Sequence, residues 1–159
     1  MTNFGRIFVF ILALCLAPVC LAQDLTIRLI DATNGRPMPK QPVSVAFLYD
    51  KKYQPNVPPK PEKGVNLETD ANGEAHFQFP VPPPAHFAAE ARVDWSRWHC
   101  ACALLASPDE LIKKGIVGSI PAGGSGLPGD LIKPVPGRII LFASPLSLWE
   151  RLLYPFEKE

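Results

Sequence analysis

The chain has 159 residues and an almost even balance of 16 basic and 15 acidic side chains, which gives a formal net charge of +1 at pH 7. A nearly neutral chain offers no basic surface to nucleic acid, so we expect neither DNA nor RNA as a partner. The length fits one domain with a core of its own, and the 19 prolines favour strands that are joined by irregular loops.

The first 22 residues have the pattern of a secretory signal peptide. Arg6 is the one charged residue before Asp24, and the apolar run Ile7–Leu16 follows it. Small residues then lead to Cys20-Leu21-Ala22, which predicts cleavage after Ala22. An uncleaved anchor is the alternative. In both cases the segment predicts export across the inner membrane, into the periplasm, the cell envelope or the medium.

Alternating apolar and polar residues, and two runs that are apolar on both faces (Trp98–Leu105 and Gly137–Ala143), predict seven strands within residues 23–143, which we expect to form one domain. Five of them are Leu25–Ile30, Val43–Tyr49, Phe87–Trp95, Trp98–Leu105 and Gly137–Ala143, and two more flank a turn at Asp70. Such alternation gives a strand one buried and one wet face, as is typical of an antiparallel sheet. Seven short strands of this kind predict an all-β, two-sheet sandwich.

The segment Asp70-Ala71-Asn72-Gly73 predicts a tight turn that closes a hairpin. The Asp70 carboxylate can accept backbone N–H bonds inside the turn, Asn72 tolerates the bridge region, and Gly73 supplies a positive φ.

A short helix is expected after the sixth strand. Ser107 would cap it, Pro108 would take its first position, and Gly115 would end it. The following segment, residues 118–136, is rich in glycine and proline, and we expect it to be a loop without structure of its own.

The C-terminal segment, residues 144–159, predicts an amphipathic helix that opens at Ser144-Pro145 and runs to about Tyr154. Its apolar face is formed by Trp149, Leu152, Leu153 and Phe156, which recur at helical spacing. We expect this face to pack on the sandwich beside the last strand. The alternative is that it projects toward a partner or makes a peripheral contact with the membrane interface.

Cys100 and Cys102 form the arrangement with the greatest chemical interest, next to His99. Residues two apart on a straight strand face the same side, about 6.6 Å apart between Cα atoms, which is near the upper limit for a disulfide. Two free, buried thiols in a central strand are therefore the preferred interpretation. A disulfide at a bend and a copper-type metal site with His99 are the alternatives.

One stretch of the chain resembles the carboxypeptidase regulatory-like domain. The residues that carry the resemblance are Asp31, Gly35, Pro37 and Pro39, the strand Val43–Tyr49, and the run Thr69–Phe77. The resemblance covers about Leu25 to Trp95 and implies a seven-stranded, antiparallel prealbumin-like (transthyretin-like, Ig-like) sandwich. Members serve as accessory or adhesive modules on secreted and outer-membrane proteins, so no cofactor or catalytic residue is implied.

The same sandwich is similar to that of intradiol ring-cleaving dioxygenases, which hold non-haem iron with two tyrosines and a His-x-His pair. The candidate ligands here are Tyr49, Tyr53, His76, His86 and His99, and none of them forms a His-x-His pair. We therefore expect a non-catalytic exported binding or structural module without a cofactor, whose partner is a protein or an envelope component. The alternatives are a periplasmic metal or redox carrier that uses Cys100 and Cys102, and an iron enzyme of the dioxygenase type.

Overall fold

The computed structural model describes residues 24–49, 63–100, 102–121 and 127–153. Within these ranges the chain forms nine strands, two α-helices and one 3-10 helix. The strands are β1 Leu25–Asp31, β2 Pro42–Leu48, β3 Lys63–Glu68, β4 Glu74–Phe77, β5 His86–Ala91, β6 Trp98–Cys100, β7 Ala103–Ala106, β8 Ile116–Val117 and β9 Arg138–Pro145. The helices are α2 Pro108–Lys114, α3 Leu148–Leu153 and the 3-10 helix η1 Gly129–Ile132.

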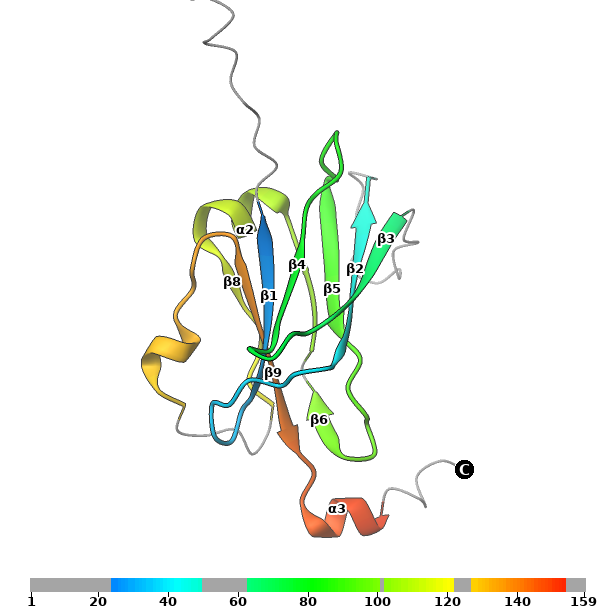
Figure 1. The fold of residues 1–159 in the computed structure, drawn as a ribbon, viewed down its shortest axis with the longest axis vertical. Coiled ribbons are helices and arrows are strands. Elements are labelled where there is room, and N and C mark those ends of the chain that lie inside the picture. The colour runs from blue at the N-terminus through cyan, green and yellow to red at the C-terminus, as the bar shows by residue number, and fades with distance from the viewer. Residues whose placement is uncertain (1–23, 50–62, 101, 122–126, 154–159) are drawn as a thin grey trace, which may run out of the picture.

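The strands form two sheets, and together the sheets make a β-sandwich (Figure 1). The first sheet has the order β4-β1-β9-β6, with β8 also paired to β9, and the second has the order β3-β2-β5-β7. The second sheet is antiparallel, as expected, but the first is mixed because β9 runs parallel to both β1 and β8. The described residues thus contain more strands than the seven expected, and two of the pairings are parallel.

The core lies between the two sheets and follows the alternation of the sequence. Leu25, Ile27 and Leu29 of β1 are buried there, opposite Val43 and Val45 of β2. Four phenylalanine rings form an aromatic cluster whose members are Phe47, Phe77, Phe79 and Phe87. Adjacent rings in this cluster meet edge-on or tilted, with centroids 5.3 to 6.5 Å apart, as aromatic pairs prefer.

A second, smaller apolar cluster lies on the other face of the first sheet. It consists of Ile30, Ala32, Ile140 and Phe142, with Val117 and Leu127 packed against it. Strand β9 is therefore buried on both faces, which explains why Ile139 to Phe142 are apolar without alternation. The expectation of a structureless loop at residues 118–136 is wrong for its described second half, which contains η1 and contributes Leu127 to this cluster.

The turn at Asp70–Gly73 forms, but the hairpin expected around it does not. Strand β3 pairs with β2 in the second sheet, whereas β4 pairs with β1 in the first. The turn therefore carries the chain from one sheet to the other. Local alternation cannot distinguish a hairpin within one sheet from a turn between two sheets. In both arrangements the inward faces of β3 and β4 point into the same core.

The expected strand Trp98–Leu105 is divided in a similar way. Strand β6 pairs with β9 in the first sheet, and β7 pairs with β5 in the second. The chain thus changes sheets next to Cys102. The preceding expected strand is also shorter, since β5 ends at Ala91 and a turn at Asp94 leads into β6.

The first expected helix is confirmed. The Ser107 hydroxyl accepts a hydrogen bond from the Glu110 amide at 3.3 Å, and Pro108 is the first helical residue of α2. Gly115 follows the last residue with φ of 77°, a left-handed value that favours glycine, and so it ends the helix.

Candidate functional site

The C-terminal helix begins at a different serine from the one expected. The Ser147 hydroxyl accepts from the Glu150 amide at 3.3 Å, and the Glu150 carboxylate accepts from the Ser147 amide at 2.7 Å. These reciprocal bonds form a capping box. Ser144, the expected cap, is instead buried in β9 opposite His99, so the strand continues through Pro145 and α3 starts after Ser147.

Two further contacts attach the base of α3 to the sandwich. The Leu146 amide donates to the Arg97 carbonyl at 2.8 Å, and His99 Nε2 lies 2.8 Å from Glu150 Oε1. The hydroxyl of Ser147, then the His99 ring and the Ser147 amide, lower the pKa of Glu150 from 4.5 to about 2. Glu150 is thus an anion that closes the helix start and also links it to β6.

The described apolar side chains of α3 are exposed. Leu148 is 72% and Trp149 is 75% exposed, and the helix stands beyond the end of the sandwich (Figure 1). The expectation that Trp149 packs beside the last strand is therefore wrong. Its physical reason is the longer β9, which carries the chain past the end of the sheet before the helix begins. The side chains of Leu152 and Leu153, and all of Phe156, lie outside the described residues.

The predicted turn residues take structural roles in the turn that precedes β4. One oxygen of Asp70 accepts from the amides of Asn72 at 2.8 Å and Glu74 at 2.9 Å, and Gly73 has φ of 71°. The Glu74 amide is the main cause that lowers the pKa of Asp70, and Asn72 adds to it. The Gly73 carbonyl accepts from the Leu29 amide at 2.9 Å, so the turn is attached to β1.

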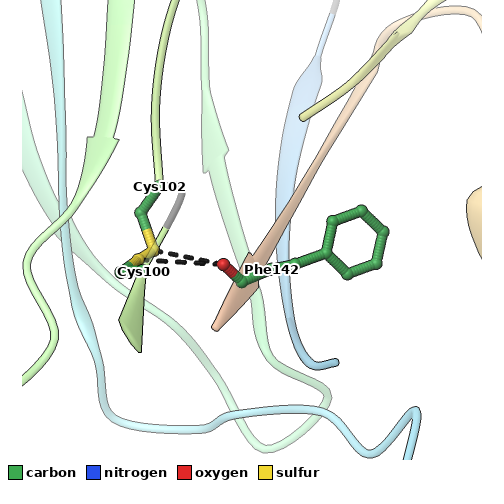
Figure 2. The surroundings of a disulfide bond; sticks show 3 residues. All are labelled: Cys100, Cys102 and Phe142. Carbon is green, nitrogen blue, oxygen red and sulfur yellow. Dashed lines mark hydrogen bonds between the residues drawn. A yellow bond between two sulfur atoms is a disulfide. The ribbon is translucent and has the colours of Figure 1, made fainter. Parts of the chain in front are cut away.

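Cys100 and Cys102 are joined by a disulfide, with their Cα atoms 4.9 Å apart (Figure 2). This separation is shorter than a straight strand allows, because the chain changes sheets between β6 and β7. The interpretation as two free thiols in a straight central strand is therefore not what the structure shows. The Phe142 carbonyl oxygen lies 3.4 Å from Cys102 Sγ and 3.8 Å from Cys100 Sγ, while the Phe142 ring points away from both.

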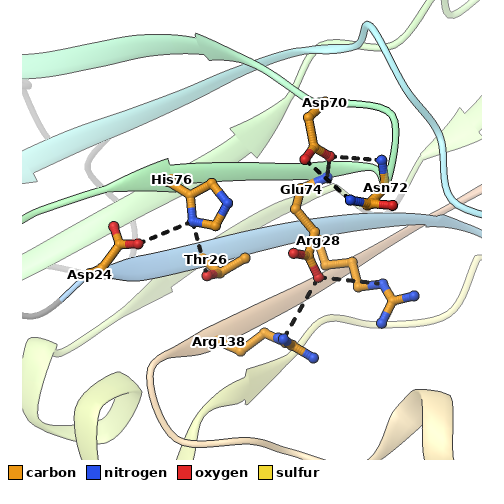
Figure 3. Close-up of polar contacts among 8 residues, drawn as sticks. All are labelled: Asp24, Thr26, Arg28, Asp70, Asn72, Glu74, His76 and Arg138. Carbon is orange, nitrogen blue, oxygen red and sulfur yellow. Dashed lines mark hydrogen bonds and ion pairs between the residues drawn. The ribbon is translucent and has the colours of Figure 1, made fainter.

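A charged cluster on the outer face of the first sheet was not found from the sequence. Glu74 Oε1 lies 4.0 Å from Arg28 Nε and 3.7 Å from Arg138 Nη2, so one carboxylate stands between two guanidinium groups (Figure 3). Its members come from β4, β1 and β9, which are neighbours in the sheet but far apart in sequence. No local signal could have identified the cluster.

A second polar group lies along the same face. His76 Nδ1 is 3.4 Å from both Asp24 Oδ2 and Thr26 Oγ1 (Figure 3). His76 is exposed, as expected for the outer face of its strand.

The candidate iron ligands are spread over the molecule. Tyr49 follows β2, and His76, His86 and His99 lie on β4, β5 and β6, while Tyr53 is outside the described residues. In the described part of the chain no three histidine, cysteine, aspartate or glutamate side chains gather as metal ligands would. None of the helices in that part is long and apolar enough to cross a membrane.

Comparisons with known proteins add little to this geometry. No protein-family model matches the chain, and no curated protein matches it. Among solved structures it is similar to the full-length major pilin SpaD from Corynebacterium diphtheriae, with 11% sequence identity and a TM-score of 0.42. The match covers 81% of this chain and 31% of the pilin, so the chain spans about a third of that protein.

Proposed function

We propose that the protein is an exported, non-catalytic binding module whose C-terminal helix makes a peripheral contact with the membrane interface. The observation that carries the proposal is the exposure of Leu148 and Trp149 on a helix that stands beyond the end of the sandwich. Single exposed apolar side chains are common on protein surfaces, whereas neighbouring ones on one projecting element are typical of a binding surface.

The choice of lipid as the contact rests on the chemistry of the segment. Trp149 is followed in the sequence by Tyr154 and Phe156, and aromatic side chains of this kind favour the boundary between acyl chains and headgroups. Basic and acidic residues are mixed along the segment. Contact would therefore rely on apolar insertion rather than on attraction to anionic lipid.

The fixed base of α3 supports the same proposal. Glu150 bonds to both Ser147 and His99, and the Leu146 amide bonds to the Arg97 carbonyl. A helix that is held at its start presents its apolar residues in one direction. Less conformational entropy is then lost when it binds.

The fold assignment within the proposal is the carboxypeptidase regulatory-like, prealbumin-like class. It is supported by two facing sheets and by the roles of Asp70 and Gly73, which serve the turn rather than a reaction. Location in the periplasm, the envelope or the medium is proposed from the signal-like residues 1–22.

The absence of catalysis is proposed because prominent carboxylates have structural partners. Asp31 accepts from Thr33 and Asn34, Asp70 holds its turn, and Glu74 stands between two arginines. A general acid or base needs freedom to exchange a proton with substrate, and these groups are engaged in the fold.

The test compares the exported chain with one that ends at Ser147. This cut keeps Leu146 and its bond to Arg97. Both chains begin at Gln23, after the predicted cleavage site, so that the apolar residues 1–22 do not contribute to vesicle binding. We expect the shorter chain to lose binding to phosphatidylcholine vesicles while it keeps a folded circular dichroism spectrum and a cooperative unfolding transition. Its free energy of unfolding should decrease only as far as the bond between Glu150 and His99 contributes to it.

Two results would overturn the proposal. Equal vesicle binding by both chains would show that α3 is not the contact. Absence of binding by either chain, together with photo-cross-linking from position 149 to an envelope protein, would show that the partner is a protein and that the lipid assignment is wrong.

A further inference from the structure

We propose that the Cys100–Cys102 disulfide is a thiol–disulfide exchange site, with the sulfur of Cys100 as the atom that an external thiol attacks. This inference is independent of the proposed membrane contact. It rests on where the disulfide lies, on what would receive the two thiols after reduction, and on the open hollow beside them.

The first argument is the small ring that this disulfide closes. A disulfide stabilises a fold mainly by restricting the unfolded chain, and the effect grows with the length of the loop between its cysteines. Cys100 and Cys102 are separated by one residue, so the bond restricts the unfolded chain very little. Stability is therefore a poor explanation for this pair.

The second argument is that the backbone on both sides is held without the disulfide. Cys100 pairs with Ala143 where β6 meets β9, and the Ala91 amide donates to the Cys102 carbonyl at 3.1 Å. The two cysteines are thus attached to different sheets by hydrogen bonds. Opening the S–S bond leaves these bonds in place, so the sandwich can accommodate the reduced form.

The third argument is an acceptor that is already in position for the reduced form. The Phe142 carbonyl oxygen is 3.4 Å from Cys102 Sγ and 3.8 Å from Cys100 Sγ (Figure 2). A disulfide has no proton to donate, whereas either thiol has one. This oxygen can therefore accept a hydrogen bond from either sulfur only after the disulfide has been reduced.

The fourth argument is access. Both cysteines line an open hollow of about 180 Å³, whose wall includes Glu90, Trp95 and Ser119. Trp95 is 51% exposed and stands at this hollow as an apolar surface for an incoming molecule. Cys102 is buried and Cys100 is only partly so, which makes Cys100 the more exposed of the two cysteines.

The exchange balances as follows in atoms and electrons. An external thiolate attacks Cys100 Sγ, the S–S bond breaks, and its electron pair passes to Cys102 Sγ, which takes a proton from solvent. A second thiol attacks the sulfur of the first in the mixed disulfide and releases Cys100 as a thiolate, which is protonated in turn. The protein gains two electrons and two protons, and the external thiols leave as a disulfide.

The test uses the full chain with Cys15→Ser and Cys20→Ser, so that Cys100 and Cys102 are the remaining cysteines of the four in the sequence. Folded protein is treated with reduced glutathione or dithiothreitol without denaturant and alkylated, and its mass is then measured by mass spectrometry. We expect two alkyl groups per chain after reduction, none after reoxidation with oxidised glutathione, and a folded circular dichroism spectrum throughout. A disulfide that opens only in denaturant would overturn the proposal.

Single variants then test which sulfur is attacked. Cys102→Ser leaves Cys100 free, and we expect it to form a mixed disulfide with oxidised glutathione at least about tenfold faster than Cys100→Ser does, because accessible thiols react faster. Equal rates, or faster reaction of Cys100→Ser, would overturn the assignment of Cys100. Thermal midpoints of both variants show whether each is folded. If one variant does not fold, the reduction of the disulfide-bonded chain still tests the exchange site itself.

Discussion

His99 Nε2 lies 2.8 Å from Glu150 Oε1, although the two residues are 51 positions apart in the chain. The contact joins β6 of the first sheet to the first turn of α3. Together with the capping bonds of Ser147, it fixes the start of the helix through polar groups. The apolar residues Leu148 and Trp149 are consequently not needed to attach the helix to the sandwich, and they are exposed.

The titration of Glu150 should report this arrangement directly. Its pKa is lowered from 4.5 to about 2, with the Ser147 hydroxyl as the largest cause. Because the folded value is the lower one, the charged form stabilises the folded state above about pH 4.5, and this stabilisation is lost as the pH falls toward 2. Carboxyl NMR should show Ser147→Ala raising the pKa toward 4.5.

The matched control for this titration is Ser107→Ala, which removes the corresponding cap of α2 and should leave the pKa of Glu150 unchanged. Glu150→Gln should also flatten the decrease in thermal midpoint between pH 4.5 and 2. A Glu150 pKa near 4.5 in the unmodified protein would show that the capping box and the link to His99 do not form in solution.

Phe77→Ala should be strongly destabilising. The ring of Phe77 is buried and lies 5.5 Å from that of Phe79 and 6.5 Å from that of Phe87. Removing such a ring leaves a cavity and costs about 3–5 kcal/mol of unfolding free energy, measured by denaturant titration. The adjacent Gln78 is exposed, and Gln78→Ala should change stability by less than about 0.5 kcal/mol. Similar effects of the two substitutions would contradict the assigned inward face.

Gly73→Val should destabilise the turn between the sheets. Gly73 has φ of 71°, and a Cβ there would lie 2.7 Å from the Leu29 carbonyl oxygen and 2.9 Å from the Met38 amide nitrogen. Both the backbone strain and the contact with β1 oppose a side chain, so we expect a loss of about 1–3 kcal/mol or more.

The control for the turn is Gly129→Val, since a Cβ at Gly129 would have no neighbour within 4 Å. Its thermal midpoint should shift far less than that of Gly73→Val. Equal midpoints for the two variants would argue that the chain passes from β3 to β4 by a different turn.

The parts of the fold that were predicted correctly depend on local chemistry. Ser107, Pro108 and Gly115 define α2 through their own hydrogen bonds and dihedral angles, and Asp70 and Gly73 define a turn in the same way. Strand positions followed the alternation of apolar residues. Each of these signals acts over a few residues and can be identified in the sequence.

The parts of the fold that were predicted wrongly depend on contacts with residues that are distant in the sequence. Ser144-Pro145 and Ser147 through Glu150 are both plausible helix starts, and pairing of Ser144 with His99 in the sheet selects the second. The partners of β3 and β4, and the change of sheet after Cys100, also depend on strands elsewhere in the chain. The alternation of apolar residues predicts which face of a strand points inward, but it does not predict which strand pairs with it.

The membrane contact of α3 is tested most directly by vesicle binding of the exported chain, from Gln23 onward, that carries Leu148→Asp and Trp149→Asp together. The control is Val81→Asp, which places one carboxylate at a 94% exposed apolar residue in the β4–β5 connection, at the opposite end of the sandwich (Figure 1). We expect the double variant to lose binding to phosphatidylcholine vesicles while the control binds like the unmodified protein. Undiminished binding by the double variant would contradict the proposal that α3 is the membrane contact.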